Sequence, residues 1–100
     1  MAEIVWTHEA VRWLEEIFEH IAADNPHAAT AVTSGIFERA QILGDFPQIG
    51  YLYRKEREGE IRVLLHGHYR IAYLVREGRV DLLGVFHAAL DIGRLLGPSD

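Results

Sequence analysis

The sequence contains no cysteine, and no apolar run in it approaches the length of a membrane-spanning helix. Without cysteine the chain can form neither a disulfide nor a thiolate metal site, so core packing is its source of stability, which suits a reducing compartment. A bilayer span needs roughly 20 apolar residues, and the start, Met1-Ala2-Glu3, lacks the basic region of a signal peptide. We therefore expect a soluble, cytoplasmic protein that does not contact a membrane.

Large size and positive charge are also missing. The 100 residues, 49% of them hydrophobic, are too few for two independently stable cores, so we expect a single domain over residues 1–100. The formal net charge is -5, whereas proteins that bind phosphate backbones rely on clustered lysine and arginine. We expect no direct sequence-specific DNA binding by this chain.

The charge is unevenly distributed along the chain. Residues 1–50 contain two basic and eight acidic residues, whereas residues 51–100 contain eight basic residues, seven of them arginine, and seven acidic ones. A local cationic surface in the second half is therefore compatible with the acidic total. A solvated face of paired charges is the alternative interpretation.

The first half of the chain predicts a strand and two helices. Residues 3–6 are β-prone, and Thr7 after them is a suitable N-cap for a helix. The apolar stripe of this helix consists of Ala10, Leu14, Ile17 and Ile21. Asn25-Pro26 ends it and begins a second helix, for which Gly44 is the expected C-cap. The second stripe consists of Ala29, Val32, Ile36, Ala40 and Leu43.

The second half predicts strands. Residues 61–65 and 71–75 alternate in character and should pair as a hairpin around Gly67. Residues 80–86 are apolar on both sides, which favours a central strand.

The remaining segments complete the expected architecture. The mixed-charge run 54–58 predicts a mobile, solvated loop, and residues 91–96 predict a last helical turn. The order β-α-α-β-β-β predicts an α+β fold in which the helical hairpin packs across one face of a mostly antiparallel sheet.

Five segments follow one another at characteristic intervals. They are Ala10, Leu14 and Ile17 with His20-Ile21; Asn25-Pro26-His27-Ala28-Ala29; Ile36, Leu43, Pro47 and Gly50; Arg62 before Tyr69-Arg70-Ile71-Ala72-Tyr73-Leu74-Val75; and Leu83-Gly84-Val85-Phe86-His87 with Asp91 downstream. Each segment alone is unspecific, but together and in this order they resemble the RelE/ParE toxin superfamily, over most of the chain.

This resemblance implies the toxin of a type II toxin-antitoxin system, with a role in plasmid stabilisation, that a ParD-like antitoxin neutralises. Large exposed apolar patches usually mark partner sites, and the chain has more aromatic side chains than its small core needs. We expect Trp13, Phe37, Tyr51 and Tyr53 to form an antitoxin-binding groove, with Trp6 and Phe46 as further candidates. Packing in the core is the alternative role for each of them.

The superfamily contains ribosome-dependent mRNA endoribonucleases of the RelE type and ParE-type toxins that act on DNA gyrase. RNA cleavage by attack of the 2'-hydroxyl needs cations around the phosphate and an acid-base group. If the chain is a nuclease, its catalytic candidates are Arg62, Arg70 and His87. A salt bridge to a helix carboxylate is the alternative role for Arg70.

We favour the ParE-type branch, in which the chain is not an enzyme. The nuclease branch generally carries further basic residues, and it has a C-terminal Tyr or His, whereas no Tyr or His follows His87 in this chain. A net charge of -5 also disfavours docking on ribosomal RNA. The resemblance then implies gyrase as the target, and the candidate target-binding residues are Arg70, His87, Arg94, Leu95 and Leu96. A RelE-type endoribonuclease and an inactive, binding-only relic remain the alternatives.

One histidine pair is the only motif that suggests a metal. His66 and His68 could bind one ion together, but Gly67 between them favours a turn and no third ligand is evident. The sequence also lacks a glycine-rich phosphate loop, a serine-nucleophile elbow and a dinucleotide-binding fingerprint. We therefore expect neither a metal nor a cofactor.

Overall fold

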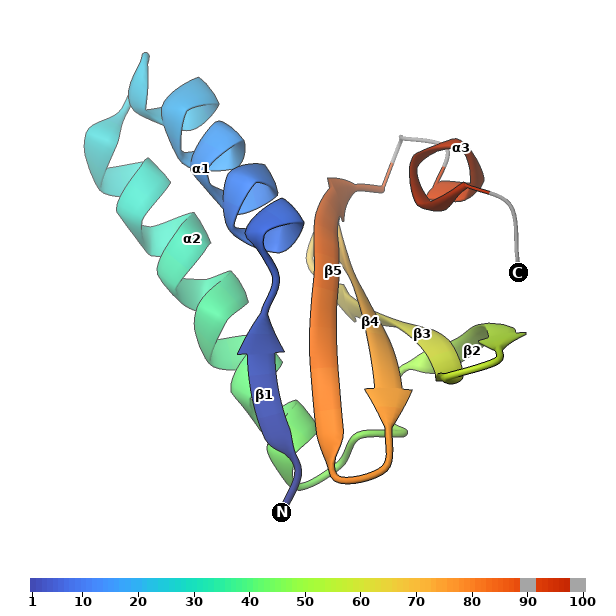
Figure 1. Cartoon of the computed structure of the whole chain (residues 1–100). Helices are drawn as coiled ribbons and strands as arrows, with labels where there is room; N and C mark the ends of the chain where they lie inside the picture. The colour runs from blue at the N-terminus through green and yellow to red at the C-terminus, as the bar shows by residue number, and fades with distance from the viewer. Residues whose placement is uncertain (89–91, 98–100) are drawn as a thin grey trace.

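The computed structural model of the chain describes residues 1–88 and 92–97. The elements are β1 (Glu3–Trp6), α1 (His8–Ala22), α2 (Pro26–Gln41), the short 3-10 helix η1 (Ile42–Gly44), β2 (Tyr51–Glu56), β3 (Gly59–His66), β4 (Tyr69–Arg76), β5 (Arg79–His87) and α3 (Ile92–Leu96). The strands form one sheet in the order β1-β5-β4-β3-β2, beside which α1 and α2 lie as an antiparallel pair (Figure 1). The predicted α+β fold with a helical hairpin on a mostly antiparallel sheet is confirmed.

Both helix starts follow the sequence prediction. The Thr7 hydroxyl oxygen accepts a hydrogen bond from the backbone N-H of Ala10 at 3.2 Å, and its own O-H donates to the carbonyl of Leu82 at 2.6 Å. The Asn25 side chain accepts from the N-H of Ala28 at 3.1 Å. These caps satisfy N-H groups that a helix leaves unpaired in its first turn, and Thr7 also joins α1 to β5.

The predicted C-cap at Gly44 is wrong. Helix α2 ends at Gln41, Ile42 is its C-cap, and the chain continues into η1 with Gly44 buried at its end. The carbonyl of Gly44 accepts a hydrogen bond from the N-H of Ala2 at 2.8 Å, and a side chain at this position would begin 3.4 Å from the Ala2 carbonyl oxygen. Gly44 therefore joins the end of η1 to the N-terminal segment rather than ending α2.

Both faces of the sheet carry packed apolar side chains. Strand β1 is parallel to β5, the other neighbours are antiparallel, and β5 lies between β1 and β4, as its apolar sequence predicts. Side chains on the helical face pack against α1 and α2; they include Leu64, Ile71, Tyr73, Val80, Leu82 and Val85. On the opposite face, Val63, Ala72 and Phe86 pack against Ile92 of α3. We call this second surface the α3 face.

The segment 54–58 is not the loop that its charges predict. Residues 54–56 belong to β2, an edge strand that pairs with β3, and a two-residue turn at 57–58 joins the two strands. Residues two apart on a strand share one face, so Arg54 and Glu56 can pair, with 2.7 Å between Nε and Oε1. The mixed charges therefore stabilise a strand, and the sheet has one strand more than predicted.

The end of the chain is described in part. Helix α3 confirms the predicted last helical turn over residues 92–96, whereas Asp91 lies outside the described residues. Across the ranges 1–88 and 92–97, no helix has the length and apolar character required to cross a membrane.

Candidate functional site

Arg62 holds the loop that precedes β2. Its Nη1 donates to the carbonyl of Gly50 at 2.7 Å and to the carbonyl of Gln48 at 3.2 Å, and its Nε donates to Glu60 at 2.9 Å. The buried hydroxyl of Tyr73 accepts a hydrogen bond from the N-H of Gly50 at 2.9 Å. Burial raises the pKa of Tyr73, an effect that the Gly50 hydrogen bond and the charge of Arg62 reduce. Arg62 and Tyr73 together fix the backbone at residues 48–50.

The three nuclease candidates do not converge. Residues paired across antiparallel strands share a face. Arg62 pairs with Tyr73 and so lies on the helical face, whereas Arg70 pairs with Phe86 and lies on the α3 face. His87 pairs with Tyr69 and so lies on the same face as Arg62, but far from it. Tyr69 is four residues from Tyr73, the partner of Arg62, which corresponds to roughly 13 Å along β4 at about 3.3 Å per residue. The structure therefore places no two of Arg62, Arg70 and His87 together.

Arg70 differs from the other arginines of the sheet. Arg54, Arg62, Arg76 and Arg79 each contact a carboxylate, at 2.7 to 3.2 Å. Arg70 has no ion pair in the described part of the chain, and its Nε is buried without a hydrogen-bond partner. Its cross-strand neighbour Leu65 is 56% exposed. An unpaired cation thus lies beside an exposed apolar side chain, which suits contact with a partner.

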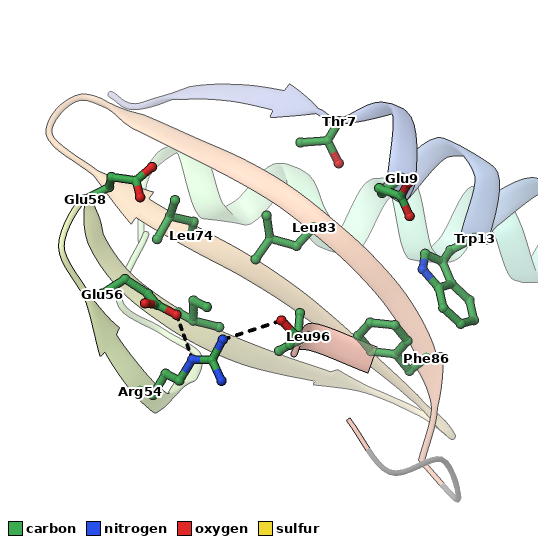
Figure 2. Close-up of a pocket in the computed structure, with 11 residues that line it drawn as sticks. Thr7, Glu9, Trp13, Arg54, Glu56, Glu58, Leu74, Leu83, Phe86 and Leu96 are labelled. Atoms are coloured by element: carbon green, nitrogen blue, oxygen red, sulfur yellow. Dashed lines mark hydrogen bonds and ion pairs between the residues drawn. The ribbon is translucent and has the colours of Figure 1, made fainter. Parts of the chain in front are cut away.

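A groove of about 410 Å³ lies on the α3 face, between the start of α1 and the β2 edge (Figure 2). Figure 2 shows Arg54 between Glu56 and Leu96. Its Nη1 donates to the carbonyl of Gly97 at 2.6 Å and its Nη2 to that of Leu96 at 3.5 Å. Arg54 therefore caps the last carbonyls of α3. Sequence reasoning does not reach this role, because the two segments are more than 40 residues apart in the chain.

The C-terminal target-binding candidates are only partly described. Leu96 packs with the apolar cluster of the α3 face and lines the groove. Arg94 and Leu95 belong to α3, but their side chains lie outside the described residues. Arg70 and Leu96 therefore share a face of the sheet, whereas His87 is on the other face.

The aromatic antitoxin-binding candidates are spread over separate places. Phe37, 47% exposed on α2, stacks on Trp6 with 5.8 Å between ring centroids. Tyr51, 45% exposed, lies at the start of β2, and Phe46, 58% exposed, lies in the loop before it. Tyr53 is half-buried, and the Cζ of Arg54 lies over its ring, 5.8 Å from the ring centroid.

Trp13, the remaining antitoxin-binding candidate, alone lines the groove of Figure 2. That these side chains bind the antitoxin stays a prediction.

The two histidines of the candidate metal pair point to different neighbours. Gly67 adopts a φ of 57° in the β3–β4 turn, as predicted. His66 lies near Gly35 of α2, where an added side chain would be 3.3 Å from its Nε2, whereas the ring of His68 stacks on that of His87 at 6.1 Å. No group of three or more metal-ligating side chains occurs among the described residues.

The fold resembles that of chains from two solved toxin-antitoxin systems. A chain of the chromosomal ParDE system from P. aeruginosa superposes with a TM-score of 0.72 and 20% identity, over 87% of this chain and 96% of that one. A chain of the RelBE2 toxin-antitoxin complex from Mycobacterium tuberculosis superposes with a TM-score of 0.58 and 25% identity, over 86% of this chain and 96% of that one.

The sequence assigns the family. The profile described as ParE toxin of the type II toxin-antitoxin system parDE matches residues 4–92, so the chain belongs to the ParE toxin family. A candidate toxin of Sinorhizobium fredii, Y4kP, is 35% identical over 85 residues, which are 85% of this chain and 86% of the relative. Toxin RelE2 of Caulobacter vibrioides is 29% identical over 89 residues, which are 89% of this chain and 98% of the relative. The protein is a toxin of a type II toxin-antitoxin system.

Proposed function

We propose that this toxin acts on DNA gyrase, without cleaving RNA, and that a ParD-like antitoxin neutralises it. The observation that carries the proposal is the separation of Arg62, Arg70 and His87 over two faces of the sheet, in a chain that belongs to the ParE family. The choice of gyrase follows the resemblance to ParE-type toxins. Such a toxin acts in the cytoplasm, where its target is.

RNA cleavage needs a different arrangement. A cation at the phosphate and an acid-base group must both lie within hydrogen-bond distance of the reacting atoms, about 3 Å. Arg62 is already engaged by two loop carbonyls and a glutamate, and Arg70 lies on the opposite face from His87. A toxin that acts by binding has no such requirement.

The target-binding surface in this proposal is the α3 face near Arg70. The unpaired guanidinium offers a charge for an acidic partner, exposed Leu65 offers apolar contact, and Leu96 of α3 lies on the same face. Arg94 and Leu95 remain target-binding candidates on the resemblance alone, since their side chains lie outside the described part of the chain. His87 lies outside this surface.

The test begins with induced expression of the chain alone in a bacterial host, scoring filamentation, DNA-damage response and mRNA integrity. Purified toxin is then assayed for inhibition of gyrase supercoiling, and for mRNA cleavage in cell-free translation. Inhibited gyrase with intact mRNA supports the proposal. Cleaved mRNA assigns the second candidate, a RelE-type endoribonuclease, which the RelE2 relative favours. A harmless chain that still binds an antitoxin is the inactive relic.

A matched pair of variants tests the surface. Arg70→Met removes the charge and keeps an unbranched stem, so we expect toxicity to fall while the fold is retained. Lys55→Met on the exposed part of β2 changes the net charge equally and should leave toxicity unchanged. If Arg70→Met were as toxic as Lys55→Met and the wild type, Arg70 would be excluded from the target surface.

A further inference from the structure

Trp13 lines two separate hollows of the surface. Its ring packs edge-on against Phe86, with 4.8 Å between centroids. A side chain at Gly84 would begin 3.2 Å from the indole and 2.7 Å from the Phe86 ring. The indole therefore lies close to the β5 backbone because residue 84 is glycine. The larger hollow is the groove of Figure 2.

The second hollow has a volume of about 270 Å³. Its walls are mostly apolar, and one carboxylate and three further rings complete them. The lining residues are Trp13, Glu16, Ile17, His20, Ile21, Tyr69, Val85 and His87. We call it the Trp13 hollow.

Glu16 gives the Trp13 hollow a negative charge. Among the described residues it forms no ion pair, and Arg12, one turn earlier on α1, lines a separate hollow with it without pairing. The first half of the chain carries two basic and eight acidic residues. Besides the imidazoles of His20 and His87, Glu16 is the ionisable group with a carboxylate in the lining, and this carboxylate favours a cationic occupant over an anionic one.

We propose that the Trp13 hollow receives an arginine side chain from a protein partner. A planar guanidinium stacks on aromatic rings and bonds a carboxylate through two N-H groups, whereas its methylene stem suits the walls of Ile17, Ile21 and Val85. The partner is an arginine-bearing segment of the antitoxin. The identity of the partner rests on the proposed function, whereas the binding of arginine in the hollow does not depend on how the toxin acts.

The test uses a small probe and its neutral isostere. Nα-acetyl-arginine amide and Nα-acetyl-citrulline amide are titrated into the ¹⁵N-labelled full chain, and the indole N-H signals are followed by NMR. We expect a saturable shift of the Trp13 signal, with arginine bound about two- to five-fold more tightly than citrulline, the range of an exposed ion pair. Trp6 is the internal control, since it lies elsewhere, against Phe37.

Two glutamate variants separate the pocket from general charge. Glu16→Gln should abolish the preference for arginine, whereas Glu19→Gln, exposed on the same helix and outside the hollow, should keep it. Both sites are on the surface, and the NMR spectrum reports whether each variant is folded. Equal binding of the two probes, or an unchanged preference in Glu16→Gln, would overturn the proposal. Neither result bears on gyrase inhibition, and loss of gyrase inhibition would leave the pocket intact.

Discussion

Replacement of Tyr73 by phenylalanine tests the attachment of the loop before β2. The substitution deletes the hydroxyl that accepts the N-H of Gly50, and Gly50 is buried, so that N-H loses its partner. An unsatisfied buried donor costs about 1–3 kcal/mol in the free energy of unfolding. For a domain of this size, this corresponds to a fall in Tm of at least about 4 °C.

The assay is urea unfolding at pH 7, followed by circular dichroism, with Tyr51→Phe as the matched control. Tyr51 is exposed, so its loss of a hydroxyl should change stability by less than about 0.5 kcal/mol. If Tyr73→Phe were as stable as Tyr51→Phe, the hydrogen bond to Gly50 would not hold the loop, and our reasoning would be refuted.

The free energy of unfolding should also depend on pH through the Tyr73 hydroxyl, and Tyr73→Phe should remove this dependence. Burial raises the pKa of Tyr73 in the folded chain above the ordinary value of 10.0. The unfolded chain therefore loses this proton at lower pH than the folded chain does, so the stabilising effect is complete below pH 10 and declines as pH rises through the folded-state pKa. Wild-type stability should fall more steeply than that of Tyr73→Phe in this range.

Three further predictions concern other contacts. Arg54→Ala removes the cap of α3, so amide hydrogen exchange at 93–97 should accelerate at least about five-fold, with Arg57→Ala in the adjoining turn as control. Gly50→Ala places a methyl group 2.6 Å from a strand carbonyl and 2.7 Å from a tyrosine hydroxyl, and should lower stability by about 1–3 kcal/mol in urea unfolding. Gly84→Ala should displace the neighbouring aromatic rings and cost a similar amount, and an unchanged Tm would contradict the close contact.

The sequence predicts those features that depend on neighbours in the chain. Thr7 and Asn25 were recognised as caps because an N-cap bonds to an N-H three residues later. The sequence misplaces the end of α2 because the apolar stripe continues through Leu43 into the 3-10 turn of η1, so its period does not show where the α-helix stops. Strand β2 was missed because its charges pair along the strand and its hydrogen bonds come from β3.

The candidate site was predicted less well for the same reason. Arg70 was identified, but the sequence alone did not show that Arg62 and Arg70 occupy opposite faces, because that depends on the register of the hairpin. The sequence also does not distinguish Trp13, which lines the groove of Figure 2, from the other aromatic candidates, because hydrophobic character alone does not specify where on the surface a side chain lies. Glu16 was not identified as part of a hollow, since the other walls come from β4 and β5.

The parallel pairing of β1 with β5 determines when, during synthesis, the sheet can be completed. Trp6 pairs with Leu82, and the Thr7 hydroxyl bonds to the same residue, so the first strand finds its neighbour only after most of the chain has been made. At roughly 5–20 residues per second, about 75 residues take roughly 4–15 s to translate. During that interval the nascent toxin has an incomplete sheet, so a cell gains several seconds between the start of toxin translation and the first folded molecule.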